Sequence, residues 1–262
     1  MSGQARPVVL LTGAAQGIGR ATATALAARG YRLALIDVQQ AAVQELAELL
    51  RKDSATVAAE PADVSDREAL RAAVVRLEAQ AGPTDVAVAC AGVGGLTSFY
   101  DLDMPGFRKM LEVNVLGVAQ TIEAVLPGMV ERKAGHIVGI SSVASYRGLP
   151  WMASYCASKA AVATYLEGLR PILKRRGITI TTVFPGFVRT GMTVSTPFRK
   201  PVKMLEPDQA ARYLVRAIER RPRDYAFPPA AALGMGVLRR LPNVVFDWMI
   251  DRAGPQALTT DF

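Results

Sequence analysis

Cysteine and histidine are scarce in this chain, whose 262 residues include only Cys90, Cys156 and His136 of these types. Two cysteines far apart, each in an apolar context, predict reduced and mostly buried thiols rather than a disulfide framework. No cluster of His, Cys or carboxylate residues has the spacing of metal ligands, so a metal centre is not expected. His136 opens an apolar run, which favours a structural role.

Long hydrophobic runs are also lacking, although 50% of the residues are hydrophobic. No run reaches the roughly 18 residues expected of a membrane-spanning helix. The first run, 8–11, is too short for the core of a signal peptide and leads directly into a glycine-rich turn. These features predict a cytoplasmic protein. Because no linker rich in Pro, Gly or Ser interrupts the pattern, we expect a single domain over residues 1–262.

Charge is unevenly distributed along the chain, which has a net charge of +8. Residues 1–130 carry 11 basic and 14 acidic side chains, a net of −3, whereas residues 131–262 carry 20 and 9, a net of +11. A basic half can attract an acidic carrier, an anionic membrane or nucleic acid, or can be a solvated surface. Because no nucleic-acid-binding module accompanies the charge, nucleic acid is not an expected partner.

Short apolar runs alternate with helical stretches along the whole chain. Such runs lack clean polar alternation when helices cover both faces of a sheet. The alternation therefore predicts the α/β class, with a doubly wound parallel sheet of seven strands, or Rossmann fold. The predicted strands are 8–11, 33–36, 56–59, 86–89, 136–140, 178–184 and 225–227.

A glycine-rich turn, Thr12-Gly13-Ala14-Ala15-Gln16-Gly17-Ile18-Gly19, follows the first predicted strand and precedes a helical stretch. Its backbone N–H groups can approach a pyrophosphate at the start of the helix. Asp37 ends the second strand, where a carboxylate accepts hydrogen bonds from adenosine ribose hydroxyls and repels a 2′-phosphate. Since Val38-Gln39-Gln40 supplies no arginine, the sequence favours NAD(H) over NADP(H).

Tyr155 and Lys159 are four residues apart within a predicted helix, so both side chains lie on one face. A free tyrosine titrates near 10, but a neighbouring ammonium group favours the phenolate. We therefore expect Tyr155 to act as the general acid in reduction and as the general base in oxidation.

The spacing TGxxxGxG, Asn114, Ser142 and Tyr-x-x-x-Lys resembles the short-chain dehydrogenase/reductase family over roughly residues 6–228. The resemblance implies the strand order 3-2-1-4-5-6-7 and a catalytic set of Asn114, Ser142, Tyr155 and Lys159. Ser142 would bond the substrate oxygen, Lys159 would also hold the nicotinamide ribose, and Asn114 would anchor a water that links Lys159 to solvent.

The same resemblance implies further cofactor contacts. Asp63 and Val64 would border the adenine, Ala91 and Gly92 would line the cleft, and Val188 and Thr190 would meet the nicotinamide carboxamide. One position departs from the family pattern, because Cys90 stands where Asn is usual and a supporting contact of the central sheet is in question. The complete expected cofactor-binding set is Gly13, Gln16, Gly17, Ile18, Gly19, Asp37, Asp63, Val64, Ala91, Gly92, Tyr155, Lys159, Pro185, Gly186, Val188 and Thr190.

These residues predict an oxidoreductase that transfers a hydride between a nicotinamide cofactor and a small-molecule secondary alcohol or ketone, hydrophobic in character. The predicted pocket is apolar, and residues 187–206 form a substrate lid over it. Two alternatives remain: an NADPH-dependent reductase of 3-oxoacyl thioesters, whose basic half would dock an acidic carrier, and a non-catalytic dinucleotide-binding sensor or scaffold. The intact catalytic set argues against the second. The apolar residues expected around the pocket are Leu149, Trp151, Met152, Phe187, Met192 and Phe198.

The C-terminal extension, residues 229–262, combines apolar residues with arginines, and Pro242 must break any helix there. It can pack over the substrate pocket or on a neighbouring subunit, or it can lie at a membrane interface; we expect the packed arrangement. By resemblance, two long helices near 105–131 and 154–176 pair across a two-fold axis. This implies a homo-oligomer, either a dimer or a tetramer.

Overall fold

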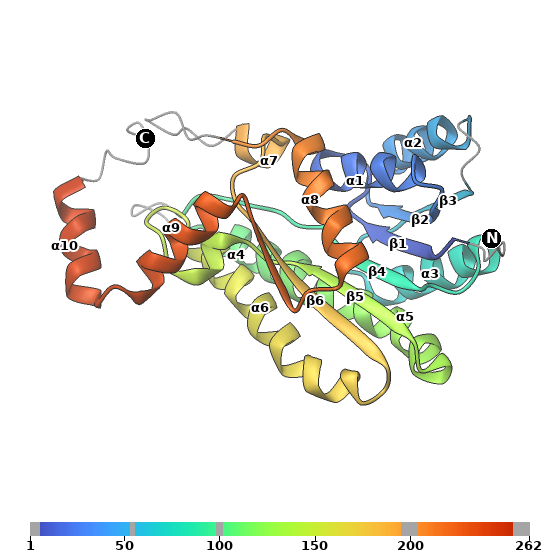
Figure 1. Cartoon of the computed structure of the whole chain (residues 1–262). Coiled ribbons are helices and arrows are strands. Elements are labelled where there is room, and N and C mark those ends of the chain that lie inside the picture. Colours follow the sequence, from blue (N-terminus) through green and yellow to red (C-terminus); the bar gives the residue numbers. More distant parts are fainter. Residues whose placement is uncertain (1–5, 53–55, 98–101, 195–203, 254–262) are drawn as a thin grey trace.

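Seven parallel strands form one sheet in the order β3-β2-β1-β4-β5-β6-β7 (Figure 1). The computed structural model describes residues 6–52, 56–97, 102–194 and 204–253. The predicted α/β class and strand order are confirmed. The order reverses between β1 and β4, and a crevice forms at the carboxyl ends of parallel strands at such a point. The strands are β1 (Val8–Thr12), β2 (Arg32–Asp37), β3 (Val57–Pro61), β4 (Val86–Ala89), β5 (Gly135–Ile140), β6 (Ile178–Pro185) and β7 (Asp224–Phe227).

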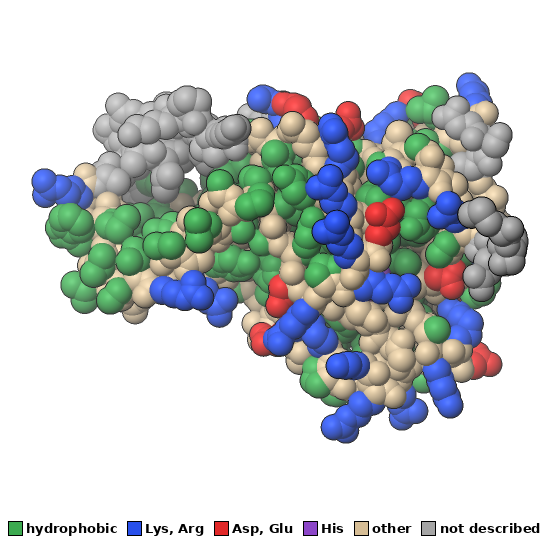
Figure 2. Space-filling model, in the orientation of Figure 1, with side chains coloured by type: hydrophobic (Ala, Val, Ile, Leu, Met, Phe, Trp, Pro, Cys, Tyr) green, Lys and Arg blue, Asp and Glu red, His purple; other side chains and the backbone are tan. Residues whose placement is uncertain are grey.

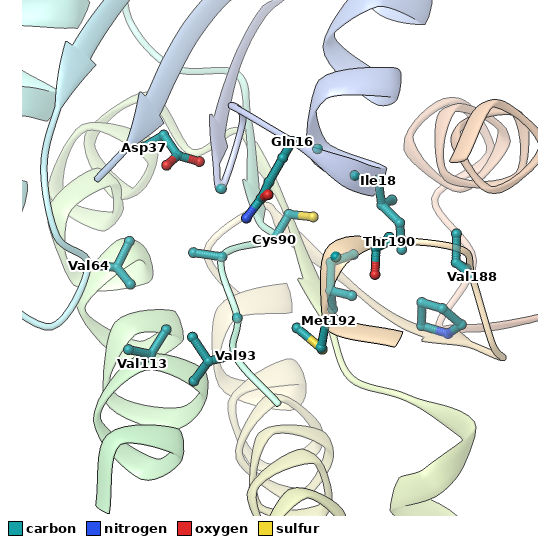
Figure 3. A pocket seen from close by; sticks show the side chains of 18 of the residues that line it. Gln16, Ile18, Asp37, Val64, Cys90, Val93, Val113, Val188, Thr190 and Met192 are labelled. Carbon is teal, nitrogen blue, oxygen red and sulfur yellow. The ribbon is translucent and has the colours of Figure 1, made fainter. Parts of the chain in front are cut away.

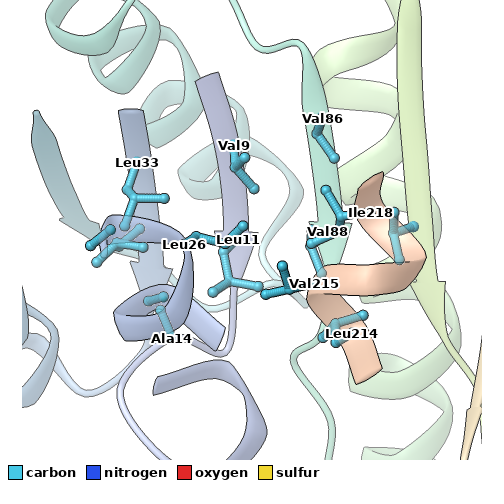
Figure 4. Packing of buried hydrophobic residues seen from close by; sticks show 14 of the residues in the cluster. Val9, Leu11, Ala14, Leu26, Leu33, Val86, Val88, Leu214, Val215 and Ile218 are labelled. Carbon is cyan, nitrogen blue, oxygen red and sulfur yellow. The ribbon is translucent and has the colours of Figure 1, made fainter. Parts of the chain in front are cut away.

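Helices cover both faces of the sheet. The helices on one face are α1 (Gly17–Ala27), α2 (Gln40–Lys52) and α8 (Pro207–Arg220), and those on the other are α3 (Arg67–Ala81), α5 (Gly117–Arg132) and α6 (Ala153–Lys174). Figure 4 shows Leu26 of α1 and Val215 of α8 packed toward Leu11 of β1. Double-sided burial explains why the strands read as continuous apolar runs.

One long helical stretch, Met104–Arg132, crosses the second face. It consists of α4 (Met104–Met110), a π-helical segment η1 (Leu111–Leu116) and α5. By length and composition alone this stretch could cross a membrane. Here its apolar residues Val118, Ile122 and Val125 are buried in the core beside the sheet, which accounts for its composition.

The segment after β6 departs from the strand-helix rhythm. Part of the predicted lid forms the short helix α7 (Gly191–Val194) and a bridge between Val188 and Leu205, whereas residues 195–203 lie outside the described residues. After β7, α9 (Pro229–Arg240) and α10 (Asn243–Ala253) are separated at Pro242, as its missing N–H requires. Figure 1 shows α10 at the edge of the molecule, away from the sheet.

Among the scarce reactive side chains, Cys156 and His136 are buried, whereas Cys90 is partly exposed and lines a cleft at the ends of the central strands. Cys90 and Cys156 are free thiols, as predicted. His136 is fully buried in β5 with its Nε2 atom 2.9 Å from Thr181 Oγ1. Burial lowers the pKa of His136 to about 3, so the ring is neutral at physiological pH.

Candidate active site

A cleft of about 290 Å³ lies at the carboxyl ends of the central strands. In Figure 3, Asp37 and Val64 lie toward one end of this cleft, and Thr190 and Val188 lie toward the other. Of the residues predicted for cofactor binding and catalysis, Asn114 alone does not line it. Those that do are Gly13, Gln16, Gly17, Ile18, Gly19, Asp37, Asp63, Val64, Ala91, Gly92, Ser142, Tyr155, Lys159, Pro185, Gly186, Val188 and Thr190.

The glycine-rich turn leaves no room for side chains. Gly13 has a φ of +69°, and a Cβ atom there would lie 2.7 Å from the Cα atom of Ala91. A Cβ atom on Gly19 would collide with the carbonyl oxygen of Gly13. The turn therefore packs directly against the end of β4 and presents bare backbone at the start of α1. Exposed backbone N–H groups at the start of a helix are what binding of a dinucleotide pyrophosphate requires, so the residues fit the expected cofactor.

Asp37 is buried at the end of β2 and is fixed by the backbone. Its Oδ2 atom accepts a hydrogen bond of 2.9 Å from the N–H of Ala15, and its Oδ1 atom accepts one of 2.9 Å from the N–H of Gln39. These bonds tie the carboxylate to the glycine-rich turn. Each oxygen retains a lone pair that can accept a ribose hydroxyl.

Lys109 of α4 lines the same cleft, although no motif in the sequence pointed to it. Its Nζ atom lies 3.3 Å from Asp63 Oδ2, while Ser65 donates to Asp63 Oδ1 from both its backbone N–H and its hydroxyl. Burial raises the pKa of Asp63, but the Ser65 hydrogen bonds and the Lys109 charge outweigh it and hold the pKa below its usual value. This end of the cleft therefore carries an ionised, paired carboxylate.

Ser142 and Tyr155 meet at the opposite end. Ser142 lies just before a short 3-10 helix, η2 (Val143–Tyr146), and its Oγ atom accepts a 3.1 Å hydrogen bond from the N–H of Ala144. The Ser142 hydroxyl donates a 3.3 Å hydrogen bond to the carbonyl oxygen of Pro185, and Ser142 and Tyr155 both line the cleft, so both hydroxyl groups can bond one substrate oxygen. Burial raises the pKa of Tyr155 to about 12, and the nearby Ser142 hydroxyl offsets only part of that effect. The phenol is therefore protonated near neutrality.

Lys159 is buried one turn along α6 from Tyr155. Its Nζ atom donates a 3.0 Å hydrogen bond to the carbonyl oxygen of Ile140 and lies 5.9 Å from the centre of the Tyr155 ring. Burial lowers the pKa of Lys159 to about 8. The expected depression of the tyrosine pKa by this ammonium group is not observed, because desolvation dominates at both residues.

Asn114 is fully buried in the π-helical segment η1 behind the cleft wall. Its Oδ1 atom accepts from the N–H of Val93 at 2.8 Å, and its Nδ2 atom donates to the carbonyl oxygen of Val93 at 2.9 Å and to Ser158 Oγ at 3.0 Å. The amide thus ties the loop after β4 to α6. In this structure Asn114 positions the residues around the reacting groups rather than facing the cleft itself.

Thr12 provides a link across the sheet near the unusual Cys90. The Thr12 Oγ1 atom accepts hydrogen bonds from the N–H groups of Cys90 at 3.2 Å and Ala91 at 3.3 Å. These contacts join the end of β1 to the segment after β4 without a side chain from position 90.

A second cavity, of about 420 Å³, adjoins the cofactor cleft, and Ser142 and Tyr155 line both. Four expected apolar residues line it, whereas Trp151 does not and Phe198 lies outside the described residues. Helix α9 forms one wall of this cavity. The sequence alone had not decided whether the C-terminal extension packs over the pocket. The apolar residues that line the cavity include Leu96, Val143, Leu149, Met152, Phe187, Met192, Ala231, Met235 and Leu238.

Two curated proteins illustrate the similarity of this chain to known sequences. An uncharacterized oxidoreductase of Myxococcus xanthus is 38% identical over 91% of this chain and 94% of that protein. The 17-beta-hydroxysteroid dehydrogenase 13 of Rattus norvegicus is 35% identical over 80% of this chain and 71% of that protein.

Solved structures lead to the same family. A short chain dehydrogenase/reductase from Burkholderia phymatum in complex with NAD aligns with a TM-score of 0.81 and 27% identity, over 90% of this chain and 93% of that one. A short-chain dehydrogenase from Sphingobium yanoikuyae in complex with NADPH aligns with a TM-score of 0.77 and 26% identity, over 90% and 97%. The sequence pattern of the short chain dehydrogenase family matches residues 7–199. The chain therefore belongs to the short-chain dehydrogenase/reductase family of oxidoreductases.

Proposed function

We propose that this enzyme interconverts an apolar ketone and the corresponding secondary alcohol with NAD(H). One observation carries the proposal: Ser142 and Tyr155 lie where the cofactor cleft meets an apolar cavity. A carbonyl carbon placed there can be close to a nicotinamide ring on one side while its apolar substituents fill the cavity. The cofactor, when bound, supplies or accepts the hydride.

The residues of the chain move the proton. In reduction, the Ser142 and Tyr155 hydroxyl groups hydrogen-bond the substrate oxygen where negative charge develops, and Tyr155 donates its proton from Oη. In oxidation, Tyr155 takes the alcohol proton. Lys159 stabilises the resulting phenolate by its charge and holds the nicotinamide ribose, while Asn114 keeps the loop after β4 in place.

A turnover screen tests this proposal. The protein is assayed with a series of secondary alcohols and their ketones of increasing apolar size, each with NAD(H) and NADP(H). We expect kcat/KM to rise with apolar size until the cavity of about 420 Å³ is filled. Absence of turnover with every pair and both cofactors would contradict the proposal and favour a non-catalytic dinucleotide-binding role.

Cofactor preference provides a second prediction. The cations among the described residues that line the cleft are Lys109 and Lys159, and Lys109 is paired with Asp63. Asp37 would repel a 2′-phosphate. We expect calorimetric titration to show tighter binding of NADH than of NADPH. Asp37→Ala should narrow the difference between the two affinities, because it lowers the affinity for NADH and frees the N–H groups of Ala15 and Gln39. Val64→Ala is the control, since it changes no charge in the cleft and should weaken the binding of both cofactors alike. Equal affinities of NADH and NADPH for the wild-type protein would contradict the prediction.

Self-association of the chain provides a third prediction. Leu116 at the end of η1 is 51% exposed and Ile172 on α6 is 63% exposed, on the two long helical stretches that resemble the pairing helices of the family. Light scattering is expected to give a mass of at least twice 28.0 kDa. Ile172→Asp should shift the protein toward the monomer, whereas Val75→Asp on α3 should not. A wild-type monomer at micromolar concentration would refute the expectation.

A further inference from the structure

The two faces of α9 have different surroundings. Ala231, Met235 and Leu238 belong to an inner stripe that lines the apolar cavity. Leu233 and Val237 lie on the opposite side of the helix and are 72% and 53% exposed. An amphipathic helix normally turns a polar face outward, so an apolar outer face on a helix that already serves the substrate cavity calls for a partner.

Helix α10 is anchored to the body by Arg147, which follows η2. The Arg147 guanidinium donates to the carbonyl oxygen of Leu241 at 2.7 Å and to Asn243 Oδ1 at 2.9 Å, and it lies 4.1 Å from the centre of the Phe246 ring. Phe246 is the buried anchor of the helix. These contacts hold the Phe246 side of α10 toward the body of the protein, so the side chains on the other side of the helix face outward.

The outward side of α10 carries four exposed apolar residues beside the exposed carboxylates Asp247 and Asp251. Val244 is 80% exposed and Trp248, one turn further on, is 58% exposed, with Val245 and Met249 beside them at 41% and 40%. Figure 2 shows hydrophobic side chains gathered over the part of the surface that α9 and α10 form. We call these four residues, together with Leu233 and Val237, the tail surface. Exposed apolar side chains gathered on one part of the surface mark an interaction site.

Arginines border the tail surface. Arg239 and Arg240 are exposed at the end of α9, and the guanidinium of Arg252 lies 5.6 Å from the centre of the Trp248 ring. The three arginines outnumber the two carboxylates, Asp247 and Asp251, so the charged side chains of α9 and α10 have a net positive charge. A bilayer that contains anionic lipids offers complementary charge to the arginines, an apolar interior to the aliphatic residues and an interfacial zone that suits tryptophan.

We propose that the tail surface docks on an anionic phospholipid bilayer, so that the cavity behind α9 receives its apolar substrate from the lipid phase. The inner face of α9 packs over the cavity, as the packed arrangement expected from the sequence requires, whereas the outer faces of both helices have no packing partner among the described residues. The docking itself is independent of the proposed function; only the source of the substrate depends on that function.

Vesicle co-sedimentation of the full chain tests the docking. The probe is a vesicle of phosphatidylglycerol and phosphatidylcholine in equal parts, with pure phosphatidylcholine for comparison. The protein should sediment with the anionic vesicles at low salt and dissociate as salt screens the arginines. Arg239→Gln with Arg240→Gln should weaken binding by about 25-fold, at about five-fold for each charge. A protein that remains in the supernatant with anionic vesicles at low salt would overturn the proposal.

Two variants distinguish the tail surface from other exposed apolar residues. Val244→Gln with Trp248→Gln should weaken vesicle binding at least about tenfold, because both side chains lose the burial that the bilayer provides. Val75→Gln on α3, at an equally apolar position that is 62% exposed, should bind as the wild type does. Equal sedimentation of all three proteins would overturn the proposal, and so would a fall in the mass of the tail variant in light scattering, since the surface would then belong to a second copy.

Measurements of turnover distinguish a failure of the membrane docking from a failure of the proposed enzymatic function. Val244 and Trp248 do not line the cavity. The tail variant should therefore reduce a water-soluble ketone at the wild-type rate while losing vesicle binding. Vesicle binding by a protein without turnover would leave the docking intact and contradict only the proposed function.

Discussion

Replacement of Tyr155 by phenylalanine is expected to lower turnover by about 10² to 10⁴-fold, the effect of losing a general acid or base. That loss corresponds to about 3 to 5 kcal/mol of transition-state stabilisation. The phenylalanine ring keeps the shape of the side chain and removes only the hydroxyl group near Ser142. We therefore expect NADH affinity and thermal stability to change little beyond the roughly 1 kcal/mol of one hydrogen bond.

The matched control is Tyr165→Phe, on the same helix α6 but 41% exposed. It should leave kcat unchanged. The pH profile provides a second check on the assignment: because burial raises the pKa of Tyr155 to about 12, the rate of alcohol oxidation should rise with pH well above neutrality, and this rise should vanish in Tyr155→Phe. Turnover near the wild-type rate in Tyr155→Phe would exclude this residue as the proton donor.

Much of the architecture follows from local patterns in the sequence. Apolar runs marked all seven strands because each strand is covered on both faces, and the glycine-rich turn marked the start of α1 because Gly13 and Gly19 occupy positions without room for a Cβ atom. These are constraints on single segments. The π-helical segment at 111–116 lay within a predicted continuous helix, since no proline or glycine in it signals the change.

The parts of the site that the sequence did not reveal depend on contacts between distant segments. Lys109 reaches the cleft only because α4 lies beside the turn that holds Asp63 and Ser65. Arg147 anchors α10 through partners more than 90 residues away, and neither end of that contact belongs to a motif. Burial of Tyr155 is a feature of the same kind, because spacing along a helix indicates proximity to Lys159 but not how deeply both groups are buried.

Lys159 combines a catalytic position with a cost to stability. Its pKa is about 8 in the folded protein, below the ordinary value of 10.5, so folding disfavours its ammonium form. Below pH 8 the side chain is charged in both states and the full cost of burying the charge applies. Between pH 8 and 10.5 the folded state loses its proton first and the cost disappears. The shift corresponds to about 3 kcal/mol.

Lys159→Met should therefore reduce turnover by orders of magnitude and also alter how stability depends on pH. The free energy of unfolding of the variant minus that of the wild type should fall by about 3 kcal/mol between about pH 7 and pH 11, because only the wild type gains stability as its buried ammonium is released. Urea denaturation at each pH measures this difference, with Lys174→Met, at an exposed position of α6, as the reference for a lysine-to-methionine exchange. A difference that stays constant with pH would show that Lys159 is not buried as a charged group. A fall of this free-energy difference with pH would support the view that the Lys159 charge, which destabilises the fold, serves proton transfer at Tyr155.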